Sequence, residues 1–383
     1  MSFLAPFLSG GLIQFLWMVF GFLVVLTVLV FVHELGHYLI ARRNGVRIEI
    51  FSIGFGPELF GWNDRAGTRW KISALPLGGY VKMFGDSDGS SVLPAANVAE
   101  MTEDERAVSF FYKPLGQRAA IVGGGPLANF IFAIVVMSVL FATYGQPYMP
   151  PEIGRILSGS AAEHAGMQVG DVVTSIDGNP ITRFDDIKRL VEVGPGVPMA
   201  IVVSRNGEPV SLSVTPGAVD DGNGHQIGQL GVHGGSTVKY IRRGPASAVL
   251  HAFGETWNLS TSTLGAMWQM ITHKRSADEL GGPLRIAQLS GEVAQIGIGP
   301  LLSFMAVLSI NLGLINLFPV PVLDGGHLLF YAAEAIRGKP LGQKAHEYGF
   351  RIGMALVLTL MVFATWNDLV HLKIIEFVKG LVT

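Results

Sequence analysis

The sequence contains no cysteine and few charged residues. Cysteine is absent from all 383 residues, which excludes disulfides, thiolate metal ligands and thiol nucleophiles. Only 15% of the residues are charged, against about 25% in an average soluble domain. The net charge of −2 gives no basic surface of the kind that nucleic-acid binding usually needs. We therefore expect no nucleic-acid partner, and any metal ion must be held by histidine and carboxylate.

Charge is missing altogether from three long stretches. Residues 1–32, 119–151 and 293–323 contain no Asp, Glu, Lys or Arg, and about 20 apolar residues suffice to cross a bilayer. A purely soluble enzyme is excluded. Including a fourth apolar run near the C-terminus, we predict four membrane spans, at about 15–40, 119–144, 300–324 and 352–367.

Positive charge follows the first span and does not precede it. Arg42 and Arg43 come directly after it, so the positive-inside rule places the N-terminus outside and residues 41–118 in the cytoplasm. Basic residues between the third and fourth spans agree with this orientation. Residues 147–299 are then expected outside the cell membrane.

Residues 245–273 are apolar on one helical face only. Polar side chains occupy the opposite face, so we predict an amphipathic helix in the membrane interface rather than a fifth span. The alternative is that the apolar stripe packs on a neighbouring domain. The stripe consists of Leu250, Phe253, Trp257, Leu264, Met267 and Ile271.

Residues 152–216 have the pattern of a small soluble α+β module. Two β-rich runs flank Asn206-Gly207, a hairpin signal, and residues 182–193 predict a short helix that starts at Thr182. GSAAEHAGMQVGDVVTSIDG (159–178) resembles the PDZ domains of bacterial proteases. Such domains add an extended peptide to a sheet edge beside a helix; the alternative is a folded spacer without binding activity.

Residues 46–83 are too apolar and glycine-rich for an ordinary loop. Two strand-like runs are separated by the turn-forming GWNDRAG (61–67), which predicts a β-hairpin that dips toward the bilayer. Because open sheet edges do not occur in lipid, it must pack against the spans or line a cavity. Residues 87–105 are predicted to form a mobile cytoplasmic loop.

The first span contains the motif His33-Glu34-Leu35-Gly36-His37. Positions i and i+4 share one face of a helix, so both imidazoles can bind one ion. Glu34 lies beside them and can take a proton from a water that the ion holds. The alternative, ionisable side chains snorkelling to the interface, leaves their cost in a membrane helix unexplained.

A catalytic zinc ion usually has three protein ligands, and two histidines leave it one short. The candidates for the third are Asp324, His327, His346 and His371. Asp324 is favoured, because it ends the third apolar run on the same inner side as His37. Two prolines and two glycines within 319–326 break the helix there, which is tolerated at membrane depth where a cavity is lined. His327 either donates a hydrogen bond to Asp324 or marks the end of the span.

The HExxH of the first span and the N-x-x-P-x-x-x-L-D-G of a later span (316–325) together resemble the site-2 protease family of intramembrane zinc metalloproteases. The PDZ insertion between the second and third spans is similar to the RseP-like bacterial branch, here with a single PDZ domain. LPLGGYVKM, GGGPLANF (123–130) and GGPLRIAQ (281–288) extend the resemblance over nearly the whole chain.

The patterns and the resemblance predict an α-helical polytopic membrane protein with four transmembrane helices, a membrane-associated β-hairpin and an inserted α+β PDZ domain. The predicted segments are 1–45 (first transmembrane helix with HExxH), 46–118 (cytoplasmic-side region with the hairpin), 119–146 (second transmembrane helix), 147–235 (periplasmic PDZ domain), 236–299 (periplasmic amphipathic helix and linker), 300–330 (third transmembrane segment with LDG), 331–351 (cytoplasmic loop) and 352–383 (fourth transmembrane helix and tail).

The resemblance also implies roles for particular residues. His33, His37 and Asp324 would bind Zn²⁺, and Glu34 would act as general base and then general acid. Further roles in substrate binding fall on the family's other motif positions and on the hairpin, at Asn316, Pro319, Gly54 and Gly56. The alternatives are that the Asn bonds a carbonyl freed by proline, and that the glycines serve turn geometry alone.

By resemblance, the substrates are single-span membrane proteins already trimmed on their outer side, namely anti-sigma factors and remnant signal peptides, cut in regulated intramembrane proteolysis. The enzyme would lie in the bacterial inner membrane, its active site near the cytoplasm and its PDZ domain periplasmic. One alternative is a zinc protease like the prenyl-protein endoproteases, which the LDG at 323–325 disfavours. Another is a non-catalytic PDZ scaffold or a metal transporter, although transporters usually contain internal repeats.

Overall fold

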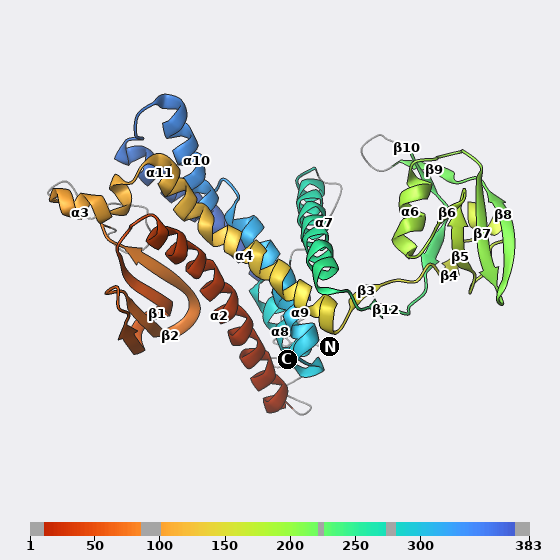
Figure 1. Ribbon diagram of the computed structural model, residues 1–383, viewed down its shortest axis with the longest axis horizontal. Helices are drawn as coiled ribbons and strands as arrows, with labels where there is room; N and C mark the ends of the chain where they lie inside the picture. The colour runs from red at the N-terminus through yellow and green to blue at the C-terminus, as the bar shows by residue number, and fades with distance from the viewer. Residues whose placement is uncertain (1–10, 86–100, 221–225, 273–280, 372–383) are drawn as a thin grey trace, which may run out of the picture. The chain divides into compact units, whose positions relative to one another are not determined.

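The computed structural model describes residues 11–85, 101–220, 226–272 and 281–371 (Figure 1). The chain divides into two compact units, one formed by Met1–Val139 with Ala248–Thr383 and the other by Leu140–Ser247. Most of the predicted loop 87–105 lies outside the described residues. Its last part leads into the short helix α3 (Glu103–Val108), whose first turn is closed by reciprocal hydrogen bonds between Thr102 and Glu105.

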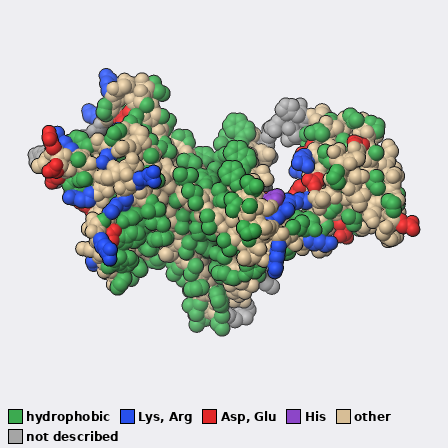
Figure 2. Space-filling view, in the orientation of Figure 1, with side chains coloured by type: hydrophobic (Ala, Val, Ile, Leu, Met, Phe, Trp, Pro, Cys, Tyr) green, Lys and Arg blue, Asp and Glu red, His purple; other side chains and the backbone are tan. Residues whose placement is uncertain are grey.

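Among the described residues, four helices of the first unit are long and apolar enough to cross a membrane, which agrees with the predicted number of spans. They are α2 (Gly11–Arg43), α4 (Leu115–Thr143), α9 (Ile298–Asn316) and α11 (Gln343–His371). At about 1.5 Å per residue, each reaches most or all of the way across a bilayer core. Figure 2 shows a broad apolar surface over these helices, with charged side chains gathered near α3 and α10. The fourth helix begins earlier than the sequence predicts, since it takes in the basic and polar residues before the apolar run.

The other helices of this unit, besides α3, are the 3₁₀ turn η2 (Phe110–Tyr112), α7 (Pro245–Ile271), α8 (Pro283–Ile296) and α10 (Asp324–Arg337). Helix α8 packs closely against α2. A Cβ atom on Gly291 would lie 2.5 Å from Cα of Met18, and one on Gly21 would lie 2.6 Å from the carbonyl oxygen of Ser290. The two helices therefore meet backbone to backbone, which fixes the N-terminal half of α2.

Helix α7 has one buried and one exposed face, as an amphipathic helix should. Its small residues Ala248 and Ala252 are buried, whereas Leu250, Phe253 and Trp257 of the predicted stripe are 75%, 62% and 65% exposed. These three side chains of the stripe therefore lie on the surface of the first unit. Large apolar side chains exposed in a row mark a surface that contacts lipid or another apolar partner.

The predicted hairpin is present as β1 (Ile48–Asn63) and β2 (Arg69–Met83), but each strand folds back on itself. Residues 50–53 pair with 79–82 on one side and with 69–72 on the other, while 58–63 pair with 69–73. The hairpin is thus a small sheet of four rows. Its bends fall at Gly54 and Gly78, whose φ angles of 89° and 135° suit glycine alone.

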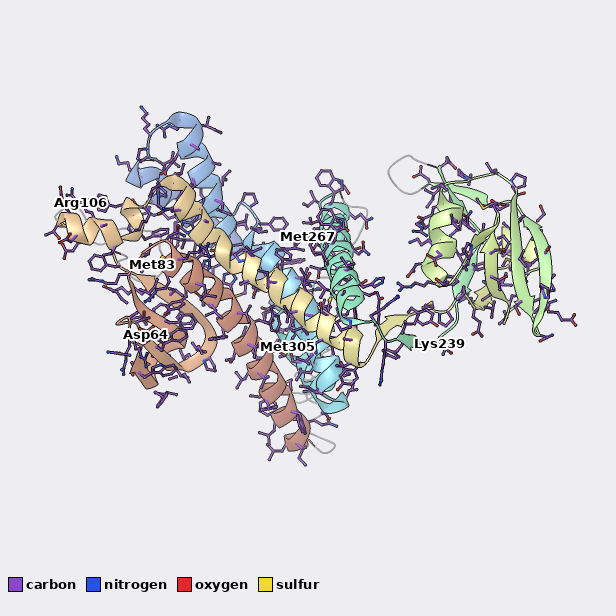
Figure 3. The ribbon with its side chains drawn as sticks, in the orientation of Figure 1. Asp64, Met83, Arg106, Lys239, Met267 and Met305 are labelled. Carbon is purple, nitrogen blue, oxygen red and sulfur yellow. The ribbon has the colours of Figure 1, made fainter. Side chains whose placement is uncertain are left out.

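The hairpin is tied to α2 through its turn. Asp64 accepts hydrogen bonds from the hydroxyl of Tyr38 (2.9 Å), from Nε1 of Trp70 (3.2 Å) and from the backbone N–H groups of Ala66 and Thr68. Although burial raises the pKa of this carboxyl, these donors hold it at about 2. The charged carboxylate therefore locks the turn onto the helix segment that follows His37. Figure 3 shows Asp64 in the hairpin beside α2.

The second unit is a small α+β module with its own hydrophobic core. Its four-stranded sheet has the order β6-β5-β7-β8, and three two-stranded pairs, β10-β9, β11-β4 and β12-β3, complete it. The strands are β3 (Gln146–Tyr148), β4 (Ile153–Ile156), β5 (Val172–Ile176), β6 (Asn179–Pro180), β7 (Met199–Arg205), β8 (Glu208–Val214), β9 (Gly217–Asp220), β10 (Gln226–Gln229), β11 (Val232–Gly234) and β12 (Lys239–Ile241), and the helices are α5 (Ala161–His164) and α6 (Phe184–Glu192).

Two local predictions for this module have different outcomes. The hairpin at Asn206-Gly207 is confirmed, with φ angles of 53° and 91° that fit a type I′ turn. The helix predicted to start at Thr182 starts instead at Phe184. The carboxylate of Asp186 accepts the backbone N–H groups of Thr182 and Arg183, and this holds both residues in the extended segment before the helix.

A buried ion pair makes the stability of this module sensitive to acid. Asp171 is 1% exposed, and the guanidinium of Arg205 donates two hydrogen bonds of 2.8 Å to it, which lowers the pKa of the carboxyl. Because the folded pKa lies below the unfolded value of about 3.9, the pair stabilises the fold above that pH and the stabilisation is lost as pH falls toward the folded pKa. We expect Asp171→Asn to remove this acid dependence and to lower the free energy of unfolding at pH 7 by about 2 kcal/mol.

Urea unfolding of the module 140–247, followed by circular dichroism from pH 7 to pH 3, measures both effects. Asp185→Asn is the control, because Asp185 is exposed on α6. An acid dependence that is unchanged in Asp171→Asn would contradict the assignment.

Candidate metal centre

Three of the predicted residues meet at one point of the first unit. His33 and His37 lie one turn apart on α2, and their Nε2 atoms are 3.2 Å apart. Asp324 brings Oδ2 to 3.2 Å from Nε2 of His33 and Oδ1 to 3.5 Å from Nε2 of His37. All three donor atoms lie within 4.8 Å of one another, a spacing that one metal ion can bridge.

Asp324 reaches the histidines because the chain breaks between α9 and α10. Helix α9 ends at Asn316, irregular chain with two prolines follows, and Asp324 is the first residue of α10. The irregular segment folds tightly over the first turn of α10, since a Cβ atom on Gly326 would lie 2.5 Å from Cα of Pro321. The predicted broken helix is therefore confirmed.

The protonation pattern of His37 suits a metal ligand. Its Nδ1 lies 2.9 Å from the carbonyl oxygen of Ile121, and since a carbonyl only accepts, Nδ1 carries the proton. This leaves Nε2, on the side of Asp324, as the nitrogen available to a metal ion. The Oδ2 atom of Asp324 is buried, and among the described residues it accepts no hydrogen bond, although Nε2 of His33 lies 3.2 Å away.

A buried carboxylate oxygen without a donor is uncommon, and a cation among the three side chains would satisfy it. Two imidazole nitrogens and one carboxylate oxygen form a donor set typical of catalytic zinc, which keeps a further position open for water or substrate. The residues present therefore fit a zinc ion.

Helix α4 passes very close to the histidine face of α2. A Cβ atom on Gly36 would overlap the carbonyl oxygen of Gly124 and lie 2.7 Å from Cβ of Ala128. One on Gly125 would overlap the imidazole of His37 and lie 2.8 Å from Cε1 of His33. The glycines of this crossing leave just enough room for the two rings.

We expect Gly125→Ala to lower zinc affinity by at least about tenfold, because the added methyl group pushes the imidazoles out of line. The matched control is Gly123→Ala, since a Cβ atom there meets nothing within 4 Å and the helix gains the same propensity. Zinc affinity, measured by competition with a chromogenic chelator, compares the two variants. Equal affinities would contradict the expectation.

Glu34 lies on the side of α2 that faces the hairpin. The backbone N–H of Val81 donates a hydrogen bond to its carboxylate, and a Cβ atom on Gly79 would lie 3.3 Å from its Cγ. Glu34, both histidines and Asp324 line one cavity of about 630 Å³. The carboxylate is therefore next to the three ligand atoms but outside their cluster.

The same cavity contains some of the other predicted residues. Asn316 and Gly56 line it, whereas Pro319 and Gly54 are not among the described residues that do. Gly54 contacts the neighbouring chain instead, since a Cβ atom on it would lie 2.7 Å from the carbonyl oxygen of Leu75. The remaining lining residues are Phe55, Gly79, Tyr80, Val81, Met83, Val122, Val322, Leu323, His327, Phe350 and Met354.

The structure also separates the four candidates for the third ligand. Asp324 joins the cluster. His327 lines the cavity, and the described residues show no hydrogen bond between it and Asp324. His346 lies elsewhere, with Nε2 3.9 Å from Oε1 of the buried Glu334, and the side chain of His371 lies outside the described residues.

Sequence reasoning missed two contacts of the histidines. Ile121 provides the carbonyl for His37, and Nδ2 of Asn129 lies 3.1 Å from Nδ1 of His33. With Gly125 between them, these positions are spaced by four and share one face of α4. The spacing of four residues between Ile121, Gly125 and Asn129, which overlaps GGGPLANF (123–130), could have indicated from the sequence that they share one helix face.

Comparison with known proteins agrees with this geometry. The model of Peptidase family M50 matches residues 21–360. Protein R01501 of Rhizobium meliloti, whose name includes the words zinc metalloprotease, is 47% identical over 91% of this chain and 95% of its own. Metalloprotease MmpA of Caulobacter vibrioides is 37% identical over 97% of this chain and all of its own.

The regulator of sigma-E protease RseP of Escherichia coli is 33% identical over 93% of this chain and 99% of its own. That alignment runs over 457 residues, more than the 383 of this chain, so the E. coli protein has segments without a counterpart here. A PDZ-domain structure from Listeria monocytogenes covers 23% of this chain at 17% identity and a TM-score of 0.20, which is too low to bear on the fold. With the family model matched over most of its length, the chain belongs to peptidase family M50, the site-2 protease family of zinc metalloproteases.

Proposed function

We propose that this protein is an intramembrane protease that hydrolyses peptide bonds within the transmembrane segments of single-span proteins. The observation that carries the proposal is the meeting of three ligand atoms and one further carboxylate in a single cavity, beside the end of a membrane-length helix. His33, His37 and Asp324 hold the zinc ion, and Glu34 moves the proton.

Zinc bound by these residues supplies a Lewis acid that polarises the scissile carbonyl and makes water more acidic. Glu34 takes the proton from the attacking water as a bond forms between that oxygen and the carbonyl carbon. It then gives the proton to the nitrogen of the scissile amide as the carbon–nitrogen bond breaks. One water is consumed, and a carboxylic acid and an amine are formed.

The hairpin provides a place for an unwound substrate. A helical segment must lose internal hydrogen bonds before its amides can be attacked, and those groups need new partners in an apolar setting. Residues 79–83 are an edge row of the hairpin sheet, paired only with 48–53 among the described residues, and most of them line the cavity. An extended substrate adds to this edge as a further strand.

Other residues assist substrate binding from the walls. Asn316, at the end of α9, lines the cavity near Asp324 and holds the substrate backbone beside the metal. Pro319 keeps the chain out of helical form after α9. Gly56 lines the cavity with a φ of 87°, while Gly54 shapes the bend behind it.

The substrates are single-span proteins already trimmed on the outer side, such as anti-sigma factors and remnant signal peptides, and the membrane is the bacterial inner membrane. Arg42 and Arg43 end α2 close to His37, which supports an active site near the cytoplasm. The name of the E. coli relative, a regulator of sigma-E protease, supports the role in signalling. The module 147–235 is a periplasmic PDZ domain that, with α7, restricts entry to short outer stubs.

Proteoliposomes test the proposal. The purified chain is reconstituted with a tagged single-span protein that lacks its outer domain, and the products are mapped by mass spectrometry. We expect cleavage inside the membrane segment that stops when zinc is removed by a chelator. Uptake of zinc into the vesicles without cleavage would identify a transporter and refute the proposal.

A further inference from the structure

Asn129 makes the second contact between α4 and the histidine pair. Its side chain is fully buried, with Nδ2 3.1 Å from Nδ1 of His33 and Oδ1 buried without a hydrogen-bond partner. An amide is polar at both ends, and burying one end unpaired destabilises the fold. Packing alone does not explain such a residue, since an apolar side chain of the same size would avoid the cost.

Asn129 faces the imidazole of His33, in which Nδ1 is the nitrogen left for contact with the rest of the protein. Nε2 of His33 lies 3.2 Å from Nε2 of His37 and 3.2 Å from Oδ2 of Asp324, so it belongs to the cluster. An imidazole that binds metal through Nε2 carries its proton on Nδ1 and needs an acceptor there. For His37 the acceptor is the carbonyl of Ile121.

We propose that Asn129 is the positioning residue of His33. Its Oδ1 accepts the Nδ1–H of His33 and so aims Nε2 at the ion. The side-chain amide reaches to 3.1 Å from Nδ1 of His33. Because the two ends of an amide have nearly the same shape, either end fits at this position without repacking. This inference rests on the proposed zinc site.

The surroundings hold the amide beside the imidazole of His33. Ser309 of α9 donates a hydrogen bond of 2.9 Å to the backbone carbonyl of Asn129, which links this turn of α4 to α9. Ile121 and Asn129 lie on the same face of α4, on either side of Gly125. The helix thus presents a backbone acceptor to His37 and a side-chain amide to His33.

Zinc affinity of the purified full-length chain in detergent tests the inference, with Zn²⁺ alone as the probe and a chromogenic chelator as competitor. Asn129→Leu keeps the volume but removes donor and acceptor, and we expect its affinity to fall by about 10–100-fold. Asn129→Asp keeps an acceptor for Nδ1–H, and we expect wild-type affinity or tighter. A pure packing role predicts the reverse order, because it tolerates leucine and penalises a buried charge.

Thermal unfolding of the metal-free proteins shows which variants fold. Asn129→Ala replaces the leucine variant if that one does not. Gly123→Ala, a change on the same helix where an added Cβ atom meets nothing within 4 Å, should keep wild-type affinity. Equal zinc affinity in Asn129→Leu and wild type, or an equal loss in Asn129→Leu and Asn129→Asp, would overturn the role of Asn129. A wild-type chain that binds no zinc would instead refute the proposed metal site.

Discussion

Replacement of Glu34 by glutamine is expected to lower the rate of peptide cleavage by about a thousandfold or more while zinc stays bound. Glutamine has the shape of glutamate but cannot take the proton from water, and general-base catalysis alone contributes about 10²–10⁴-fold. The side chain lies outside the ligand cluster of His33, His37 and Asp324, so zinc affinity should not change. Cleavage of the reconstituted substrate and zinc content, measured on one preparation, check both statements.

The matched control is Glu49→Gln. Glu49 belongs to the hairpin, where its carboxylate lies 3.1 Å from Nζ of Lys82, and it has no place in the cavity. Its variant should cleave at close to the wild-type rate. A Glu34→Gln protein that retains zinc and cleaves as fast as wild type would remove Glu34 from the mechanism.

Replacement of Asp324 by alanine is expected to abolish both zinc binding and cleavage. The variant keeps two imidazole ligands, one fewer than catalytic zinc sites use. Loss of a residue that only supports a ligand lowers metal affinity by up to about a hundredfold. Loss of a ligand itself should therefore lower zinc affinity by more than that. Zinc at 100 times the wild-type Kd should stabilise the wild type by about 2.7 kcal/mol. The variant should gain almost nothing under the same conditions.

Thermal unfolding with and without zinc measures this difference. His346→Gln serves as the control, because His346 was also a candidate ligand but lies beside Glu334 outside the cluster. Its stabilisation by zinc should match the wild type. If Asp324→Ala kept that stabilisation and His346→Gln lost it, the third ligand would be assigned wrongly.

The parts of the site that depend on local spacing were predictable from the sequence. His33 and His37 meet because four residues separate them on a helix, and the prolines and glycines around Asp324 already indicate a break beside a cavity. Asn129 and Ile121 escaped prediction because their contacts depend on how closely two helices cross. That distance is set by Gly36 against Gly124, a pairing across the fold that spacing along the chain does not show.

The hairpin shows a similar limit. The two strand-like runs and the turn at 61–67 predict two strands, and both are present. The second pairing of 50–53, with 69–72, depends instead on bends at glycines with positive φ. Glycine adopts positive and negative φ about equally readily, so the sequence alone does not predict where the strand bends. The start of α6 at Phe184 rather than Thr182 likewise depended on which N–H groups the Asp186 carboxylate would accept.

The folded-over hairpin also bears on self-association. Unpaired strand edges invite pairing between copies of a protein, and this sheet has two of them within the described residues, at 58–63 and at 79–83. The first carries Glu58, ion-paired with Arg69, a charge of the kind that discourages such pairing. The second lines the cavity beside Glu34, so a strand of another copy would have to enter this cavity in order to pair with it. On the proposed function, the edge that takes the extended substrate is thus sheltered from aggregation by its position.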